Sequence, residues 1–229
     1  GFDTGGAIDS LDKNYVAWTF RKAAKFFDCG TYTGNGVAGR QIPHGLQGVP
    51  GVIVVKRTDA DENWFVYHQS LGASNRLQLN TTDGTTVEAG PPYQTWNGEP
   101  TDTHFKVGST NRNNGNGFPY VWYAFAHDTS ADGIIQCGIF DGTSTAEVNL
   151  GWEPQFLLVK GTTAATGWWL MDSMRGMPVS GSNPLLFPNF SNAENSNNNK
   201  FVPTATGFKE VGTSSFGTGC IYLAIRSPN

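Results

Sequence analysis

The chain has 229 residues, a formal net charge of −4 and only 15% charged side chains, with its lysines and arginines dispersed. Affinity for nucleic acid comes mostly from basic groups that neutralise phosphates, so we expect no nucleic-acid partner. No apolar run approaches the roughly 18 residues of a membrane-spanning helix, and we expect no membrane insertion. The 29 glycines, 12 prolines and 7 tryptophans are typical of short strands joined by many turns.

The first strand-like run has no preceding strands with which it could form a sheet. Residues 15–20 have the pattern of the closing strand of each later module, but no module precedes them. An unpaired strand needs a sheet edge, so we expect it to add to another module or to end a preceding one. Residues 1–4 do not resemble a translation start, and we expect a fragment or a processed product.

Period-two alternation between turn residues predicts strands through the rest of the chain and no long helix. The long polar segments 81–97 and 180–200 are typical of functional or mobile loops. Within the second, residues 190–195 suit a short helical turn capped by Ser191 or Asn192. The expected strands are 27–32, 52–57, 64–68, 76–79, 103–107 and 120–126, followed by 134–140, 156–160, 168–171, 207–211 and 220–225.

The same landmarks occur twice in the same order, over residues 29–126 and 137–226. A repeated unit of roughly 100 residues predicts a modular architecture rather than a single catalytic cleft. We therefore predict an all-β chain of tandem antiparallel β-sandwich (jelly-roll-like) modules, residues 25–130 and 131–229, after an N-terminal segment, residues 1–24. The matching stretches are 29–32 and 137–140, 49–56 and 153–160, 63–66 and 167–170, 105–106 and 208–209, and 120–126 and 220–226.

The three cysteines form no dense disulfide framework. Cys29 and Cys137 are repeat equivalents in different modules, so we expect no bond between them. Cys137 and Cys220 belong to the first and last strands of the second module, which leaves a bond between them open. We favour free, buried thiols that behave as small apolar side chains.

The histidines and acidic residues follow no metal-binding pattern, and we expect no metal and no cofactor. The histidines lie in the first copy only and lack the spacing of a zinc site. The acidic run 59–62 offers oxygen ligands for calcium, but its counterpart 163–166 has no acidic residue, which favours a solvated hairpin tip. The four histidines are His44, His68, His104 and His127.

No motif points to catalysis, so we expect a protein that is not an enzyme and has no catalytic residues. Residues 142–146, around Ser144, come nearest to a nucleophile elbow but lack the closing glycine. Paired carboxylates of a glycosidase stay open, because the 19 acidic residues make chance pairs abundant.

The candidates for a binding site are Trp168 and Trp169, which are adjacent in a strand and therefore point to opposite faces of the sheet. An exposed tryptophan can stack on a sugar ring. Residues 64–65 repeat the two-sided apolar pattern in the first copy, however. Packing between sheets and between modules is therefore favoured over a ligand site.

Seven stretches carry a resemblance that covers residues 12–228. They are NYVAWTFRKA at 14–23, TYTGNG at 31–36, IPH at 42–44, VKRTD at 55–59, LGWEPQ at 150–155, DSMRG at 172–176 and PNFSNAE at 188–194. Together they resemble a repeat domain of uncharacterised function found in virion and tail-fibre-like proteins of tailed bacteriophages, notably marine phages. The resemblance brings no catalytic residues that could be assigned to this chain.

The resemblance implies a non-enzymatic structural protein of the virion surface, in a tail fibre, tail tip or other appendage that contributes to host adsorption. We expect a homo-oligomer that contacts other virion proteins and is assembled in the cytoplasm of the bacterial host. The alternatives are a carbohydrate-binding, lectin-like module that meets a host-surface glycan, and a capsid-surface decoration protein. A third hypothesis is a depolymerase that cleaves host glycan.

Overall fold

The computed structural model describes residues 16–142, 146–163, 165–198, 200–211 and 216–226. Over these ranges the chain is all-β, every strand pair is antiparallel, and no helix forms, so none is present that could span a membrane. The strands are β1 (Phe27–Thr33), β2 (Arg40–Pro43), β3 (Pro50–Arg57), β4 (Phe65–His68), β5 (Asn75–Gln78), β6 (Thr86–Val87), β7 (His104–Val107), β8 (Pro119–Ala126), β9 (Ile135–Phe140), β10 (Glu147–Asn149), β11 (Pro154–Gly161), β12 (Trp168–Asp172), β13 (Asn183–Leu185), β14 (Asn195–Asn198), β15 (Phe201–Thr204), β16 (Gly207–Glu210) and β17 (Cys220–Arg226).

The strands expected between residues 27 and 225 all form, with ends shifted by a residue or two. The strands β2, β6, β10, β13, β14 and β15 were not expected. Strands this short show little alternation, and of the four-residue strands only β4, β5, β7 and β16 were predicted. The helical turn expected at residues 190–195 is wrong: Asn195 begins β14, and its backbone pairs with Leu185 of β13. Long-range pairing has overridden the local capping signal.

The run expected as an orphan strand also differs. Tyr15 lies outside the described residues, and residues 16–20 belong to no sheet. They lie across the two halves of the molecule, held by aromatic packing rather than by a ladder of backbone hydrogen bonds. We call residues 16–22 the strap.

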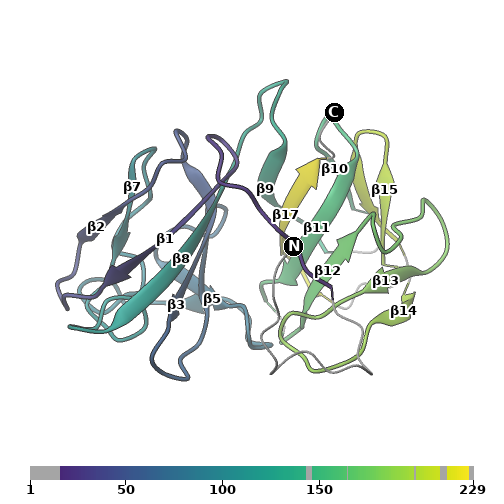
Figure 1. Cartoon of the computed structure of the whole chain (residues 1–229). Helices are drawn as coiled ribbons and strands as arrows, with labels where there is room; N and C mark the ends of the chain where they lie inside the picture. The colour runs from purple at the N-terminus through teal and green to yellow at the C-terminus, as the bar shows by residue number, and fades with distance from the viewer. Residues whose placement is uncertain (1–15, 143–145, 164, 199, 212–215, 227–229) are drawn as a thin grey trace.

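The two halves of the chain pair their strands in one scheme (Figure 1). The order is β1-β8-β3-β4-β5-β6 in the first-half sheet and β9-β17-β11-β12 in the second-half sheet. Cys29 pairs with Tyr123, and its counterpart Cys137 pairs with Leu223. A bulge follows Pro50 in β3 and Pro154 in β11. Strand order and register are therefore alike in both halves.

Each large sheet carries a smaller sheet on its outer face, β2-β7 in the first half and β10-β16-β15 in the second (Figure 1). A matching aromatic pair joins the layers on each side. The ring centroids of Phe105 and Trp122 are 5.6 Å apart, and those of Phe208 and Tyr222 are 5.2 Å apart. These edge-to-face contacts add to the stabilisation that burial alone provides.

The inner faces of the two large sheets pack against each other, and we call this contact the junction. One buried apolar cluster runs through it, with Val54 and Val66 from the first half and Phe156 and Leu223 from the second. It encloses a cavity of about 140 Å³. Because β3 and β17 are covered on both faces, nearly all their residues are buried and apolar.

Polar side chains also cross the junction to backbone carbonyls. The Trp168 Nε1–H donates to the carbonyl O of Gln78 at 2.8 Å, and the Gln69 Nε2–H donates to that of Cys137 at 2.6 Å. These bonds satisfy groups that would otherwise be buried without a partner. They also fix the two sheets in one relative position, because a hydrogen bond is more directional than apolar packing.

The repeated lysines Lys56 and Lys160 each hold the hairpin that follows their strand. The Lys56 ammonium donates to the carbonyl of Ala60 at 2.7 Å, and that of Lys160 donates to the carbonyl of Thr166. Lys160 is fully buried and also donates across the junction to the Thr82 carbonyl at 2.9 Å. Burial lowers the pKa of Lys160 to about 8.

Glycine follows the repeated cysteines because a cross-strand ring lies over it. A Cβ on Gly30 would lie 2.9 Å from the Trp122 ring, and one on Gly138 would lie 2.6 Å from the Tyr222 hydroxyl. Both distances are shorter than van der Waals contact allows. The same rings pack against the outer sheets, so neither can move away without loosening that contact.

Replacing Gly138 with Ala should therefore lower the free energy of unfolding by about 1–3 kcal/mol, because the new methyl displaces the Tyr222 ring from Phe208. Urea unfolding measures the change. The matched control is Gly48→Ala, where no atom lies within 4 Å of the added Cβ. Equal destabilisation by the two substitutions would contradict the steric explanation.

His68 is a buried titratable group in the junction, with 2% of its surface exposed. Its Nδ1 accepts the backbone N–H of Ser70 at 3.2 Å, which leaves Nε2–H to donate to the Tyr222 carbonyl at 3.1 Å. Burial lowers the pKa of His68 to about 4. The unfolded side chain takes up its proton near pH 6.5. The unfolded state therefore binds more protons between these values, and stability falls as the pH drops through this window.

His68→Gln keeps an N–H donor but does not titrate, so it should flatten part of the acid dependence of stability. The difference between wild type and variant should change by roughly 3 kcal/mol between pH 7 and pH 4. Urea unfolding at a series of pH values measures it, with His104→Gln, outside the junction, as the control. An unchanged pH profile for His68→Gln would show that His68 is not the group responsible.

Candidate functional site

The two tryptophans singled out from the sequence are both used in packing. Trp168 is 3% exposed and lies in the junction. Trp169 points to the opposite face of β12, where its ring centroid is 4.4 Å from that of Phe216. Phe187 and Phe201 also contact the Trp169 ring. The strand is covered on both sides, so adjacent tryptophans need no exposed face.

The histidines are divided between two places. His68 lines the junction cavity, and the Nδ1 of His127, in the segment between β8 and β9, accepts the backbone N–H of Cys137 at 3.1 Å. His44 and His104 both contact Thr101 on the first-half surface, at 3.1 Å and 3.0 Å. Burial is the main cause that lowers the pKa of His44 and of His127.

No three His, Cys, Asp or Glu side chains of the described residues gather as metal ligands would. In the acidic run 59–62, the Asp59 carboxylate is bound to the Arg57 guanidinium at 2.6 Å. That ion pair holds the pKa of Asp59 below its ordinary value. Ser144, the residue nearest to a nucleophile motif, lies outside the described residues.

The cysteines are free thiols. Cys137 faces the junction, whereas Cys220 belongs to the cluster on the outer face of the same sheet. The disulfide left open between them is therefore wrong, because residues on opposite faces of a sheet cannot bond. Burial raises the pKa of Cys137 well above its ordinary value and that of Cys220 to about 12, so both stay protonated thiols.

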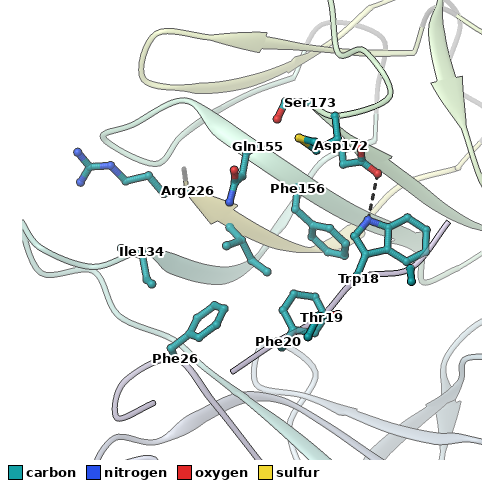
Figure 2. A pocket seen from close by; sticks show the side chains of 13 residues that line it. Trp18, Thr19, Phe20, Phe26, Ile134, Gln155, Phe156, Asp172, Ser173 and Arg226 are labelled. Carbon is teal, nitrogen blue, oxygen red and sulfur yellow. Dashed lines mark hydrogen bonds between the residues drawn. The ribbon is translucent and has the colours of Figure 1, made fainter. Parts of the chain in front are cut away.

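A groove of about 350 Å³ opens at one end of the junction, and we call it the junction groove (Figure 2). Its volume lies at the lower end of the range of small-molecule sites. Phe20, Phe26 and Phe156 form much of its wall, while Arg226 and Ser173 lie toward its rim. Its lining comes from segments 17–20, 155–156, 172–174 and 225–226, with Phe26 and Ile134.

The strap closes one side of this groove through aromatic contacts. The Phe20 ring lies 5.4 Å from that of Phe125 in the first half and 5.9 Å from that of Phe156 in the second. The Phe20 ring thus packs against both halves. The strap stays in place without strand pairing because its apolar side chains are taken out of water there.

At the polar end of the groove, Trp18 and Arg175 both bind the carboxylate of Asp172. The Trp18 Nε1–H donates to Asp172 Oδ2 at 3.0 Å, and the Arg175 guanidinium donates to the same oxygen at 2.8 Å. The Arg175 backbone N–H donates to Asp172 Oδ1 at 2.9 Å, and its guanidinium lies 5.7 Å from the centre of the Trp18 ring. The carboxylate is thereby engaged in positioning the strap on the second half.

Sequence reasoning missed this arrangement, although its parts were visible. The stretches 14–23, 150–155 and 172–176 all carry the family resemblance, and all three contribute residues to the groove. Only the folded chain brings Trp18 and Asp172 together. The sequence therefore shows these three motifs but does not indicate that they come into contact.

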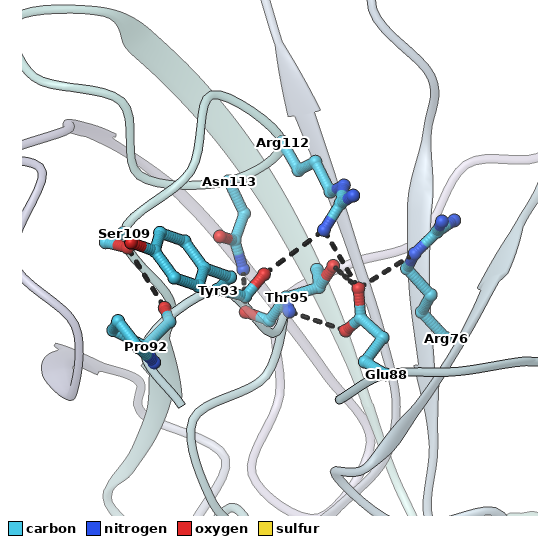
Figure 3. Close-up of polar contacts among 8 residues, drawn as sticks. All are labelled: Arg76, Glu88, Pro92, Tyr93, Thr95, Ser109, Arg112 and Asn113. Carbon is cyan, nitrogen blue, oxygen red and sulfur yellow. Dashed lines mark hydrogen bonds and ion pairs between the residues drawn. The ribbon is translucent and has the colours of Figure 1, made fainter. Parts of the chain in front are cut away.

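A second polar centre lies in the first half, around Glu88 (Figure 3). Glu88 Oε1 accepts from Arg76 Nε at 2.9 Å and from Arg112 Nη1 at 3.0 Å. Its Oε2 accepts the backbone N–H of Thr95 at 2.5 Å. The carboxylate is only 6% exposed, so one buried anion positions two cations.

Trp18→Phe should lower the free energy of unfolding by about 1–2 kcal/mol, because Asp172 loses one of its donors while the ring packing remains. Chemical denaturation of Trp18→Phe, Asp172→Asn and the double variant gives the coupling between the two side chains. A coupling near 0.5–3 kcal/mol is expected for residues in contact. Strictly additive effects would mean that the strap is not held by this bond.

Comparison with known proteins gives one family match, to the domain of unknown function DUF7483, over residues 21–226. The match includes both halves and the junction between them. No curated protein and no solved structure matches the chain. The matched region covers nearly the whole chain, and the chain belongs to the DUF7483 family.

Proposed function

We propose that this chain is a non-enzymatic structural protein of a tailed-phage virion, carried in a tail fibre, tail tip or other surface appendage, where it contributes to host adsorption. The observation that supports this most is the convergence of the resembling stretches on the junction groove. Residues 17–20, Gln155 and residues 172–174 come from three of them. The stretches that carry the resemblance thus lie where the two halves are joined.

We further propose that each half is a β-sandwich module and that the modules arose by duplication. Support comes from the common strand order, the common register and the bulges after Pro50 and Pro154. The repeated pairs Phe105–Trp122 and Phe208–Tyr222 join the layers in the same way. A jelly-roll-like arrangement of the strands is part of this proposal.

The setting we propose is the virion surface, after assembly in the bacterial cytoplasm, with other virion proteins and further copies of the chain as partners. Free cysteines agree with a reducing compartment during assembly. A junction with a shared apolar core and cross-junction bonds such as Trp168 to Gln78 suits a part that must stay rigid. Symmetric self-association is the usual plan of such parts.

The location of the chain in a particle reconstruction tests the proposal. We expect density for both halves, packed as a single body, in an appendage with rotational symmetry. The same fold on the capsid surface would instead support the decoration alternative. A purified particle whose proteins do not include the chain, by mass spectrometry, would refute the virion role.

A further inference from the structure

The centre around Glu88 borders a cleft on the first half, separate from the junction groove. The cleft has a volume of about 380 Å³. Arg76 and Gln78 of β5 line one side, and Thr110, Asn111 and Arg112 of the loop before β8 line the other. Glu62, at the tip of the β3–β4 hairpin, also lines it. Apart from Phe65, which also lines the cleft, every lining side chain can donate or accept hydrogen bonds.

Three buried polar atoms of the cleft residues have no hydrogen-bond partner among the described residues. They are Arg76 Nη1, Gln78 Oε1 and Thr110 Oγ1. Gln78 is only 8% exposed, so water reaches its side chain poorly. A buried polar group without a partner costs roughly 1–3 kcal/mol. Three such groups lining one cleft point to a ligand that supplies the missing partners.

The two guanidinium groups are held in place before any ligand arrives. Arg76 and Arg112 both bind Glu88, and Arg112 Nη1 also donates to the Tyr93 carbonyl at 3.2 Å (Figure 3). The two guanidinium groups share a single carboxylate, so their side of the cleft is positive, whereas Glu62 adds a negative charge elsewhere in the lining. Planar, fixed guanidinium groups are well suited to recognise a carboxylate. Little side-chain entropy is then lost on binding.

We propose that this cleft binds an acidic sugar residue, with its carboxylate on Arg76 and Arg112 and its hydroxyl groups on Gln78, Thr110 and Asn111. The amide and hydroxyl groups match ring hydroxyls, and Glu62 accepts a hydrogen bond from a further hydroxyl at the edge. The proposal deepens the adsorption role by naming the chemical class of the ligand, and rests on that role only for its biological setting.

Titration of the full chain with glucuronate, glucose and acetate, followed by amide chemical shifts, tests the ligand class. Glucuronate should bind and shift the amides of Thr110 and Arg112. Glucose lacks the carboxylate and acetate lacks the ring hydroxyls, so each should bind at least about tenfold more weakly, the loss of one charge-assisted interaction. Equal binding of acetate would reduce the site to a simple anion site and overturn the proposal, as would equal binding of glucose.

Thr110→Val and Gln78→Met separate binding from folding. Both remove a polar atom that has no partner in the free protein, so unfolding free energies should stay equal or rise. Affinity for glucuronate should fall about tenfold or more. The control is Thr204→Val, whose hydroxyl is likewise buried without a partner but lies in the second half. A control that loses affinity equally, or cleft variants that retain it, would refute the site.

Two substitutions that remove opposite charges from the cleft should change the affinity for glucuronate in opposite directions. Arg112→Gln should weaken glucuronate binding, whereas Glu62→Gln should strengthen it by removing a repulsive carboxylate. If both substitutions change the affinity in the same direction, the assignment of the carboxylate to the arginine side is wrong. These measurements use purified protein, so their failure leaves the virion location untouched, and absence from the particle leaves a measured affinity standing.

Discussion

Close packing of the two large sheets across the junction is the constraint on which the rest of the molecule depends. Together with the outer sheets it removes both faces of β3, β11 and β17 from water, and apolar burial is the largest favourable term in folding. It also forces buried polar groups to find partners across the contact. His68, Trp168 and Lys160 each reach a backbone carbonyl on the other half. Apolar packing and directional hydrogen bonds thus join the two halves together.

The two halves use the same strand order and register for different contacts. Cys29-Gly30 and Cys137-Gly138 keep glycine because Trp122 and Tyr222 occupy the space that a side chain would need. Lys56 of β3 donates to carbonyls of its own hairpin, whereas its counterpart Lys160 also binds the first half. The arginine cleft lies in the first half, between β5 and the loop before β8.

The junction groove and the arginine cleft illustrate two ways in which this fold positions polar groups. In the groove, Asp172 is fully engaged by Trp18 and Arg175, and it joins the strap to the second half. In the cleft, Glu88 fixes Arg76 and Arg112 while Gln78 and Thr110 keep unpartnered atoms. Satisfied networks stabilise a fold, and unsatisfied buried groups are kept at a cost in stability that a ligand can recover.

The sequence by itself determined the all-β class, the main strands and their repetition, because alternation, turn residues and matched landmarks are local properties. It also indicated that the pair Trp168-Trp169 needs cover on both faces or one exposed ring. Only the tertiary structure decided which faces meet, that Cys137 and Cys220 lie on opposite sides of a sheet, and that residues 195–198 pair as a strand. The strap and the cleft could not be predicted from the sequence either. Trp18 with Asp172, and Arg76 with Arg112, meet only because sheet packing closes long loops, and no short window of sequence records such contacts.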